Sequence, residues 1–131
     1  MNNKLKKYGN NKLIKDYINY FGDVNEKNID KVKSKINNIR TGNIEENFDV
    51  VKNADWIVEV VVEKIDIKHH LYEKILKTRK KDSIISSNTS TIPLKVLSAK
   101  MSDEDKKDFC ITHFFNPVRY MGLLEIVSEP I

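Results

Sequence analysis

Residues 56–62 have the sequence WIVEVVV, a nearly continuous run of β-branched and aromatic side chains. Such a run is typical of a strand that is covered on both faces. Ile67, Leu71 and Ile75 then recur at helical spacing. This spacing predicts a helix that ends near Arg79. A buried strand followed directly by an amphipathic helix is therefore the unit that decides the fold.

The same alternation continues toward the carboxyl terminus. Apolar strands are predicted at residues 83–87, 109–113 and 123–127, with a short helix at 94–99 between the first two. Parallel strands need a crossover of a dozen or more residues, usually a helix, so this order predicts parallel pairing. We expect an α/β fold: a partial Rossmann-like, doubly wound and mostly parallel sheet with flanking helices.

The first 35 residues differ from the rest of the chain. They are polar and rich in Lys and Asn, with one apolar patch at helical spacing between residues 13 and 21. A short strand is predicted at 36–40, because the turn signal Thr41-Gly42-Asn43 follows it. We therefore expect a helical segment over 1–35 and an α/β part over 36–131.

Composition excludes several classes of protein. The 131 residues suffice for one domain with a core, and 40% hydrophobic with 32% charged residues is ordinary for a soluble protein. The net charge of +4 is not gathered into basic patches with interleaved aromatics, so nucleic-acid binding is not predicted. No segment is long enough for a membrane span, and no signal peptide is recognisable. The single Cys110 suits a reducing compartment, so we expect a cytoplasmic protein.

Polar residues follow the predicted strands where each one ends. Glu63 comes after the first strand, Ser87-Asn88-Thr89-Ser90 after the second, and His113 ends the third. In open parallel sheets the ligand lies beyond the carboxyl ends of the strands. The sequence therefore predicts a site at this edge of the sheet.

His113 and Glu125 form the strongest candidate pair. Glu125 interrupts the apolar strand at 123–127, and a buried carboxylate there needs a partner. Paired with His113, it would fix the imidazole tautomer and stabilise the imidazolium, which suits a general base. Two plainer interpretations stay open: Glu125 faces water on an edge strand, and His113 is a satisfied core residue.

The other polar residues also have plainer interpretations. The serines and threonine at 86–90 are preferred helix caps, which is compatible with ligand contact. Spacing alone favours a solvated ion pair for Glu63 and Lys68. His69-His70 with Glu73 lacks the three-ligand set of a zinc helix, so no metal site is predicted. The Gly-x-Ser-x-Gly pattern of a nucleophilic serine is also absent.

Taken together, these segments resemble the 3-hydroxyacyl-CoA dehydrogenase family, specifically the second half of its NAD-binding domain. The resemblance covers roughly residues 36–127. Its motifs, in register, are ADWIVE at 54–59, Val62-Glu63 with Lys68, SNTS at 87–90, HFFNP at 113–117 and LEIV at 124–127.

The resemblance implies a role for each matching residue. His113 would be the catalytic base that takes the 3-hydroxyl proton while hydride leaves C3 for NAD, and Glu125 its partner carboxylate. The implied reaction oxidises a 3-hydroxyacyl-CoA to a 3-oxoacyl-CoA in fatty-acid β-oxidation. The remaining implied contacts are Ser90 and Asn116 with substrate and cofactor, and Glu63 and Lys68 with the cofactor.

The family's glycine-rich loop has no counterpart in this chain. Its Gly-x-Gly-x-x-Gly turn lets the backbone approach the pyrophosphate. The four glycines, at positions 9, 22, 42 and 122, lie too far apart to form it. The ribose-binding acidic residue and the helical domain that follows in the family have no match either.

We therefore expect the isolated chain to be inactive. It would act with a separate polypeptide that carries the glycine-rich half. The alternative is a non-catalytic remnant or protein-interaction module of a split gene. Without the first βαβ unit, the apolar faces at 56–62 and 83–87 would be bare, which favours association or oligomerisation.

Overall fold

The computed structural model describes residues 34, 37–118 and 120–129. The chain divides into two compact units, Met1–Asn43 and Ile44–Ile131. The helical segment predicted for 1–35 lies outside the described residues except for Ser34. The strand predicted at 36–40 is wrong for residues 37–40, of which Asn37 is helical. Ile39 is 51% exposed there, and no described strand pairs with this stretch.

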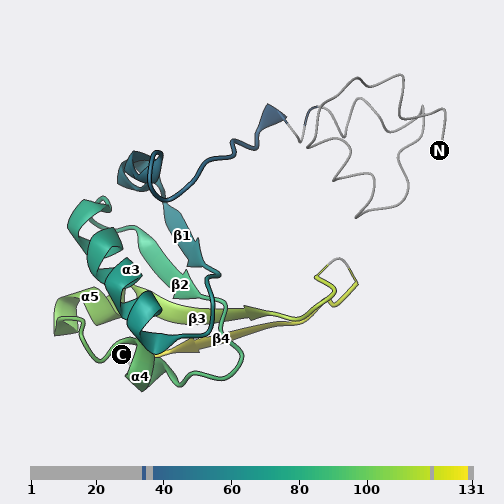
Figure 1. The fold of residues 1–131 in the computed structure, drawn as a ribbon. Coiled ribbons are helices and arrows are strands. Elements are labelled where there is room, and N and C mark those ends of the chain that lie inside the picture. Colours follow the sequence, from purple (N-terminus) through teal and green to yellow (C-terminus); the bar gives the residue numbers. More distant parts are fainter. Residues whose placement is uncertain (1–33, 35–36, 119, 130–131) are drawn as a thin grey trace. The chain divides into compact units, whose positions relative to one another are not determined.

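The second unit alternates strands and helices, as predicted (Figure 1). Two elements were not predicted, the 3-10 helix η2 and the helix α5, because both are short and rich in polar residues. In chain order the elements are η2 (Phe48–Asn53), β1 (Trp56–Glu59), α3 (Ile65–Thr78), β2 (Ile84–Ser87), α4 (Leu94–Leu97), α5 (Asp103–Lys107), β3 (Phe109–Phe114) and β4 (Leu124–Ser128).

The four strands form one sheet in the order β1-β2-β3-β4. β1, β2 and β3 are parallel, and β4 runs antiparallel to β3. The crossovers between the parallel strands contain helices, as such connections require. The predicted α/β, mostly parallel sheet is therefore confirmed.

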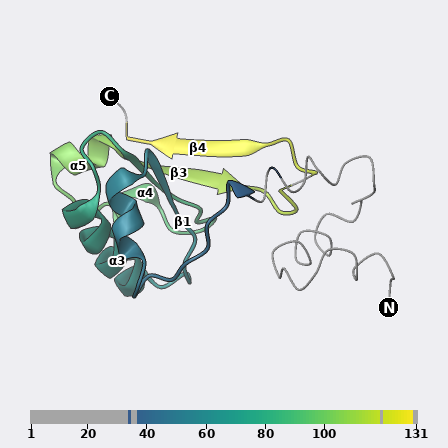
Figure 2. The same cartoon turned by 90° about the horizontal axis from the view of Figure 1, so that it is seen from above.

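One face of the sheet carries the core. Because side chains alternate along strands, Ile85 of β2 and Phe109 and Ile111 of β3 share a face. They pack with Tyr72 and Ile75 of α3, and the Tyr72 and Phe109 rings meet edge to face at 5.2 Å. Figure 2 shows α3 on one side of the sheet, and Leu94 and Leu97 of α4 belong to the same core.

The opposite face is partly bare. Trp56 and Val58 of β1 are 48% and 39% exposed, and Ile84 of β2 is 49% exposed. The predicted exposure is thus confirmed for β1. It is wrong for most of β2, because Ile85 faces the core and Ser86 is buried beneath Trp56, whose indole N–H donates to the serine oxygen (2.9 Å).

β1 is shorter than the apolar run that predicted it. It ends at Glu59, and Val60 and Val62 are 68% and 58% exposed instead of covered. The backbone N–H of Val61 donates to the Glu59 carboxylate (2.6 Å) instead of to a neighbouring strand. This bond ends the strand and leads the chain into α3.

Candidate active site

The carboxyl ends of β1, β2 and β3 meet at one edge of the sheet, because the three strands are parallel. The loop after β2 is fastened to both neighbouring strands there. The backbone N–H of Asn88 donates to the Glu59 carbonyl (2.9 Å). The side-chain oxygen of Asn88 accepts from the Phe114 N–H (2.9 Å). The loop that carries Ser90 and the strand end that carries His113 are therefore tied together.

His113 and Glu125 lie directly opposite each other in the antiparallel β3–β4 pair. His113 Nδ1 is 3.3 Å from Glu125 Oε2. The imidazole is 20% exposed and the carboxylate 57% exposed, and the ring of Phe115 lies 4.5 Å from that of His113. Of the two alternatives that the sequence leaves open for Glu125, the exposed one holds, because β4 is an edge strand of the described sheet. Glu125 therefore faces solvent on an edge strand and also contacts His113.

A second carboxylate, Glu59, is fully buried at the end of β1. Its oxygens accept from the Lys68 ammonium (2.8 and 3.0 Å), the Tyr72 hydroxyl (2.6 Å) and the Ser87 hydroxyl (2.7 Å), besides the Val61 N–H. The helix α3 contributes two of these donors, β2 contributes one, and the loop after β1 contributes the fourth. We call Glu59, Lys68, Tyr72 and Ser87 the buried network.

Lys68 and Glu63 are not the solvated pair that their spacing suggests. The Lys68 side chain is 1% exposed, and its ammonium lies between Glu59 and Glu63 (3.0 Å to Glu63 Oε2). Glu63 is 43% exposed, and its other oxygen accepts from the Thr89 hydroxyl (2.5 Å). Glu63 thus links the loop after β1 to the loop after β2, and its ion pair with the buried Lys68 ammonium fixes its position.

Electrostatics keep both glutamates ionised. Burial raises the pKa of Glu59, but hydrogen bonds from Lys68, Ser87 and Tyr72 outweigh it and hold the pKa below its ordinary 4.5. Burial likewise opposes ionisation of Glu63, and bonds from Thr89 and Lys68 lower its pKa overall. Burial and the Glu59 carboxylate raise the pKa of Tyr72, so its hydroxyl remains a donor.

Ser90 and Asn116 are exposed at the same edge of the sheet, in the loops after β2 and β3. The helix-cap interpretation of 86–90 is wrong, since α4 begins only after Pro93. Thr89 instead caps a turn, because its hydroxyl accepts from the N–H groups of Thr91 and Ile92 (3.3 and 3.1 Å). The loop is therefore fixed by Thr89, while Ser90 faces outward.

Sequence reasoning missed Glu59 and Tyr72. A signal for Glu59 existed, because it interrupts an apolar strand just as Glu125 does. Tyr72 had none, since an aromatic residue on the apolar face of a helix is usually core.

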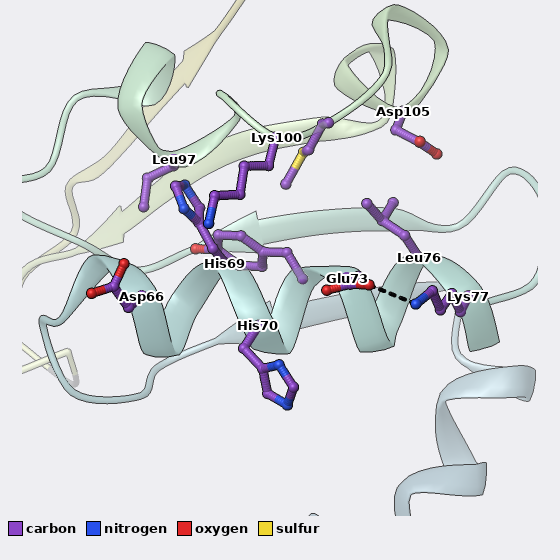
Figure 3. A pocket seen from close by; sticks show the side chains of 11 residues that line it. Asp66, His69, His70, Glu73, Leu76, Lys77, Leu97, Lys100 and Asp105 are labelled. Carbon is purple, nitrogen blue, oxygen red and sulfur yellow. Dashed lines mark hydrogen bonds and ion pairs between the residues drawn. The ribbon is translucent and has the colours of Figure 1, made fainter.

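A pocket of about 570 Å³ lies away from this edge, between α3 and the α4–α5 region (Figure 3). None of the predicted site residues lines it. Figure 3 shows Glu73 paired with Lys77 on α3 at one side of this pocket. Within residues 34, 37–118 and 120–129, no group of three or more His, Cys, Asp and Glu side chains could hold a metal ion. In the same residues, no helix is long and apolar enough to cross a membrane.

The residues at the strand ends fit part of a nicotinamide dinucleotide. Glu63, Ser90 and Asn116 present exposed polar groups in the loops after β1, β2 and β3, at the end of the sheet where β3 carries His113, and polar groups of this kind suit the nicotinamide and ribose end. The pyrophosphate end has no cradle, because no two of the four glycines stand close enough to form the loop. These residues would therefore face only one side of a bound dinucleotide.

Comparison with known proteins identifies the family. The model of the 3-hydroxyacyl-CoA dehydrogenase NAD-binding domain matches residues 3–131. A Rickettsia prowazekii protein that carries the name fatty acid oxidation complex trifunctional enzyme is 44% identical over 126 residues, or 91% of this chain and 16% of that protein. Its Rickettsia felis namesake is 52% identical over 95 residues, 72% of this chain and 13% of that protein.

Solved structures agree. The dehydrogenase part of multifunctional enzyme 1 from Caenorhabditis elegans superposes with a TM-score of 0.67 at 27% identity, covering 95% of this chain and 27% of that one. The 131 residues thus span a small share of the relatives that they match. The predicted family, fold and cofactor class are confirmed. The chain belongs to the NAD-binding domain family of the 3-hydroxyacyl-CoA dehydrogenases.

Proposed function

We propose that this chain supplies the catalytic base and its partner carboxylate to an NAD-dependent 3-hydroxyacyl-CoA dehydrogenase of fatty-acid β-oxidation. The observation that carries the proposal is the contact between His113 Nδ1 and Glu125 Oε2 (3.3 Å) at the carboxyl end of β3. The residues that make up this catalytic part lie within 36–131.

His113 would act through its second nitrogen. With Nδ1–H donating to Glu125, the Nε2 lone pair is free to accept the proton of the 3-hydroxyl group. Glu125 then stabilises the imidazolium that forms. NAD, when bound, supplies the acceptor for the hydride that leaves C3. A 3-oxoacyl-CoA results, with the proton on His113.

The neighbouring residues would place the substrate and cofactor. Ser90 and Asn116, both exposed, contact the reacting part of the acyl chain and the cofactor. Glu63 faces the cofactor, and Lys68 acts through Glu63 because its ammonium is buried between two carboxylates. Oriented groups of this kind accelerate reactions by holding reactants in a productive geometry.

A separate polypeptide would supply the glycine-rich half. β1 pairs with β2 on one edge, and no described strand pairs with its other edge. A strand added there would also bring cover for Trp56 and Val58. We also propose a cytoplasmic location for the pair, which the free Cys110 supports.

Complementation tests this function. The purified chain is mixed with a polypeptide that carries strand, Gly-x-Gly-x-x-Gly turn and helix, and NADH formation from 3-hydroxybutyryl-CoA is followed by absorbance. We expect turnover only with both parts present. His113→Ala should lower kcat by about 10²–10⁴-fold, the usual contribution of a general base. His70→Ala, at an exposed histidine of α3, should leave it unchanged.

The proposal would be contradicted if the two polypeptides fold and bind each other but form no NADH. The chain's exposed β1 edge and apolar face would then favour the second candidate, a non-catalytic protein-interaction module. Titration calorimetry separates the two, since the module should bind neither NAD nor CoA in any pairing.

A further inference from the structure

We infer that Asn88 is a positioning residue for His113; this inference rests on the proposed function. Asn88 is the first residue after β2 and is half-buried. Asn88 is not part of the His113–Glu125 pair. It acts on the strand end that carries the base.

The β2–β3 pairing stops short of His113. The register joins Ser87 to Ile111, and β2 ends there, while β3 continues to Phe114. On the other side, β4 pairs with β3 all the way to Phe114. The end of β3 is therefore held firmly to β4 and has lost its strand neighbour on the β2 side.

Asn88 replaces that missing neighbour. Its side-chain oxygen accepts from the N–H of Phe114, the residue after His113 (2.9 Å), and its own N–H donates to the Glu59 carbonyl (2.9 Å). One residue thus ties the ends of β1, β2 and β3 together. Nearer the middle of the sheet, the Thr112 hydroxyl donates to Ser86 (2.8 Å), but this contact lies before His113.

The consequence concerns the distance between His113 and Ser90. Ser90 stands two residues after Asn88 in the same loop, and His113 stands one residue before Phe114. The Asn88–Phe114 bond therefore sets how far the base lies from the residue proposed to contact substrate. Without this bond, the β3–β4 hairpin would be free to shift relative to the loop, and a displacement of about 1 Å can cost 10²-fold in rate.

The test compares three variants of the complemented enzyme. Asn88→Ala removes the acceptor, Asn88→Asp keeps an oxygen in the same place, and Asn53→Ala alters an exposed asparagine at the end of η2. We expect Asn88→Ala to lower kcat about 100-fold with little change in KM. Asn88→Asp should restore most of kcat, and Asn53→Ala should match wild type.

A second measurement uses the chain alone. Amide hydrogen exchange at Phe114 should accelerate about tenfold or more in Asn88→Ala, the loss of roughly 1.4 kcal/mol of protection, and return toward wild type in Asn88→Asp. If Asn88→Ala is unfolded by circular dichroism, Asn88→Ser, whose side chain is too short to reach Phe114, takes its place.

The outcomes separate the two proposals. If the wild-type mixture is inactive, the proposed function fails, and unchanged Phe114 exchange in Asn88→Ala would independently overturn the role of Asn88. If the wild type is active, an Asn88→Ala enzyme with wild-type kcat overturns the inference. Failure of Asn88→Asp to restore kcat would also overturn it, because the oxygen would then not be the relevant group.

Discussion

Two glutamates at strand ends, Glu59 and Glu125, each contact a basic side chain, yet their surroundings differ completely. Glu59 is fully buried and accepts from Lys68, Tyr72, Ser87 and the Val61 N–H. Glu125 is 57% exposed, and its contact with His113 is a single one at 3.3 Å. Glu59 lies on β1 and Glu125 on β4, the two outermost strands of the described sheet.

The difference separates a structural carboxylate from a chemical one. A buried carboxylate that already accepts hydrogen bonds from several donors is not available to a substrate. Removing any of its partners lowers the stability of the fold. A half-exposed pair leaves one imidazole nitrogen free for a proton and costs little to disturb. The same substitution at the two positions should therefore have opposite effects on stability and activity.

The largest effect should follow Glu59→Gln. This substitution leaves the Lys68 ammonium buried with one carboxylate fewer, and breaking a buried pair typically costs about 3–5 kcal/mol. That loss is a large fraction of the about 5–15 kcal/mol by which native domains are stable. Urea unfolding followed by circular dichroism measures it.

A double-mutant cycle supplies the control. Lys68→Met combined with Glu59→Gln removes the uncompensated charge, so the double variant should be more stable than the sum of the single losses by about 0.5–3 kcal/mol. Strict additivity would show that the two side chains do not act as a unit.

The framework of the fold was predictable because its signals are local. The helix at α3 and the strands β2 and β3 follow directly from periodicity and β-branched runs. The length of β1 was not, because the Val61 N–H turns back to the Glu59 side chain. That bond competes with strand pairing and leaves no trace in residue hydropathy.

The candidate site was predictable in part for a similar reason. Parallel strands bring their carboxyl ends together, so Glu63, Ser90 and His113 could be assigned to one edge from their order alone. Burial could not be assigned in this way. Lys68 has the spacing of a surface residue, and it is buried because Glu59 lies beneath it.

Tyr72→Phe should have an intermediate effect. It removes a hydroxyl that donates to Glu59 (2.6 Å) and leaves the aromatic contact with Phe109 in place. A hydrogen bond to a charged group contributes about 1.5–3 kcal/mol. Thermal and urea unfolding should show this loss. A Tyr72→Phe variant with the wild-type free energy of unfolding would contradict the comparison, because the hydroxyl would then contribute nothing to the stability of the buried network.

Acid should weaken the buried network. The folded pKa of Glu59 lies below its ordinary 4.5, so its contribution is fully present above pH 4.5 and is lost as pH falls through the folded pKa. In that window, uptake of one proton lowers the free energy of unfolding by up to about 1.4 kcal/mol per pH unit. Urea midpoints measured from neutral to acidic pH test this, and the slope should flatten in Glu59→Gln.

The smallest effect on stability should follow Glu125→Gln. The carboxylate is exposed, its contact with His113 is long, and such surface pairs contribute about 0–1 kcal/mol. In the complemented enzyme the same change should lower kcat markedly, because glutamine still orients the imidazole but does not stabilise its cation. A variant that loses stability and keeps kcat would place Glu125 with Glu59, as a second structural carboxylate, and would remove the observation that carries the proposed function.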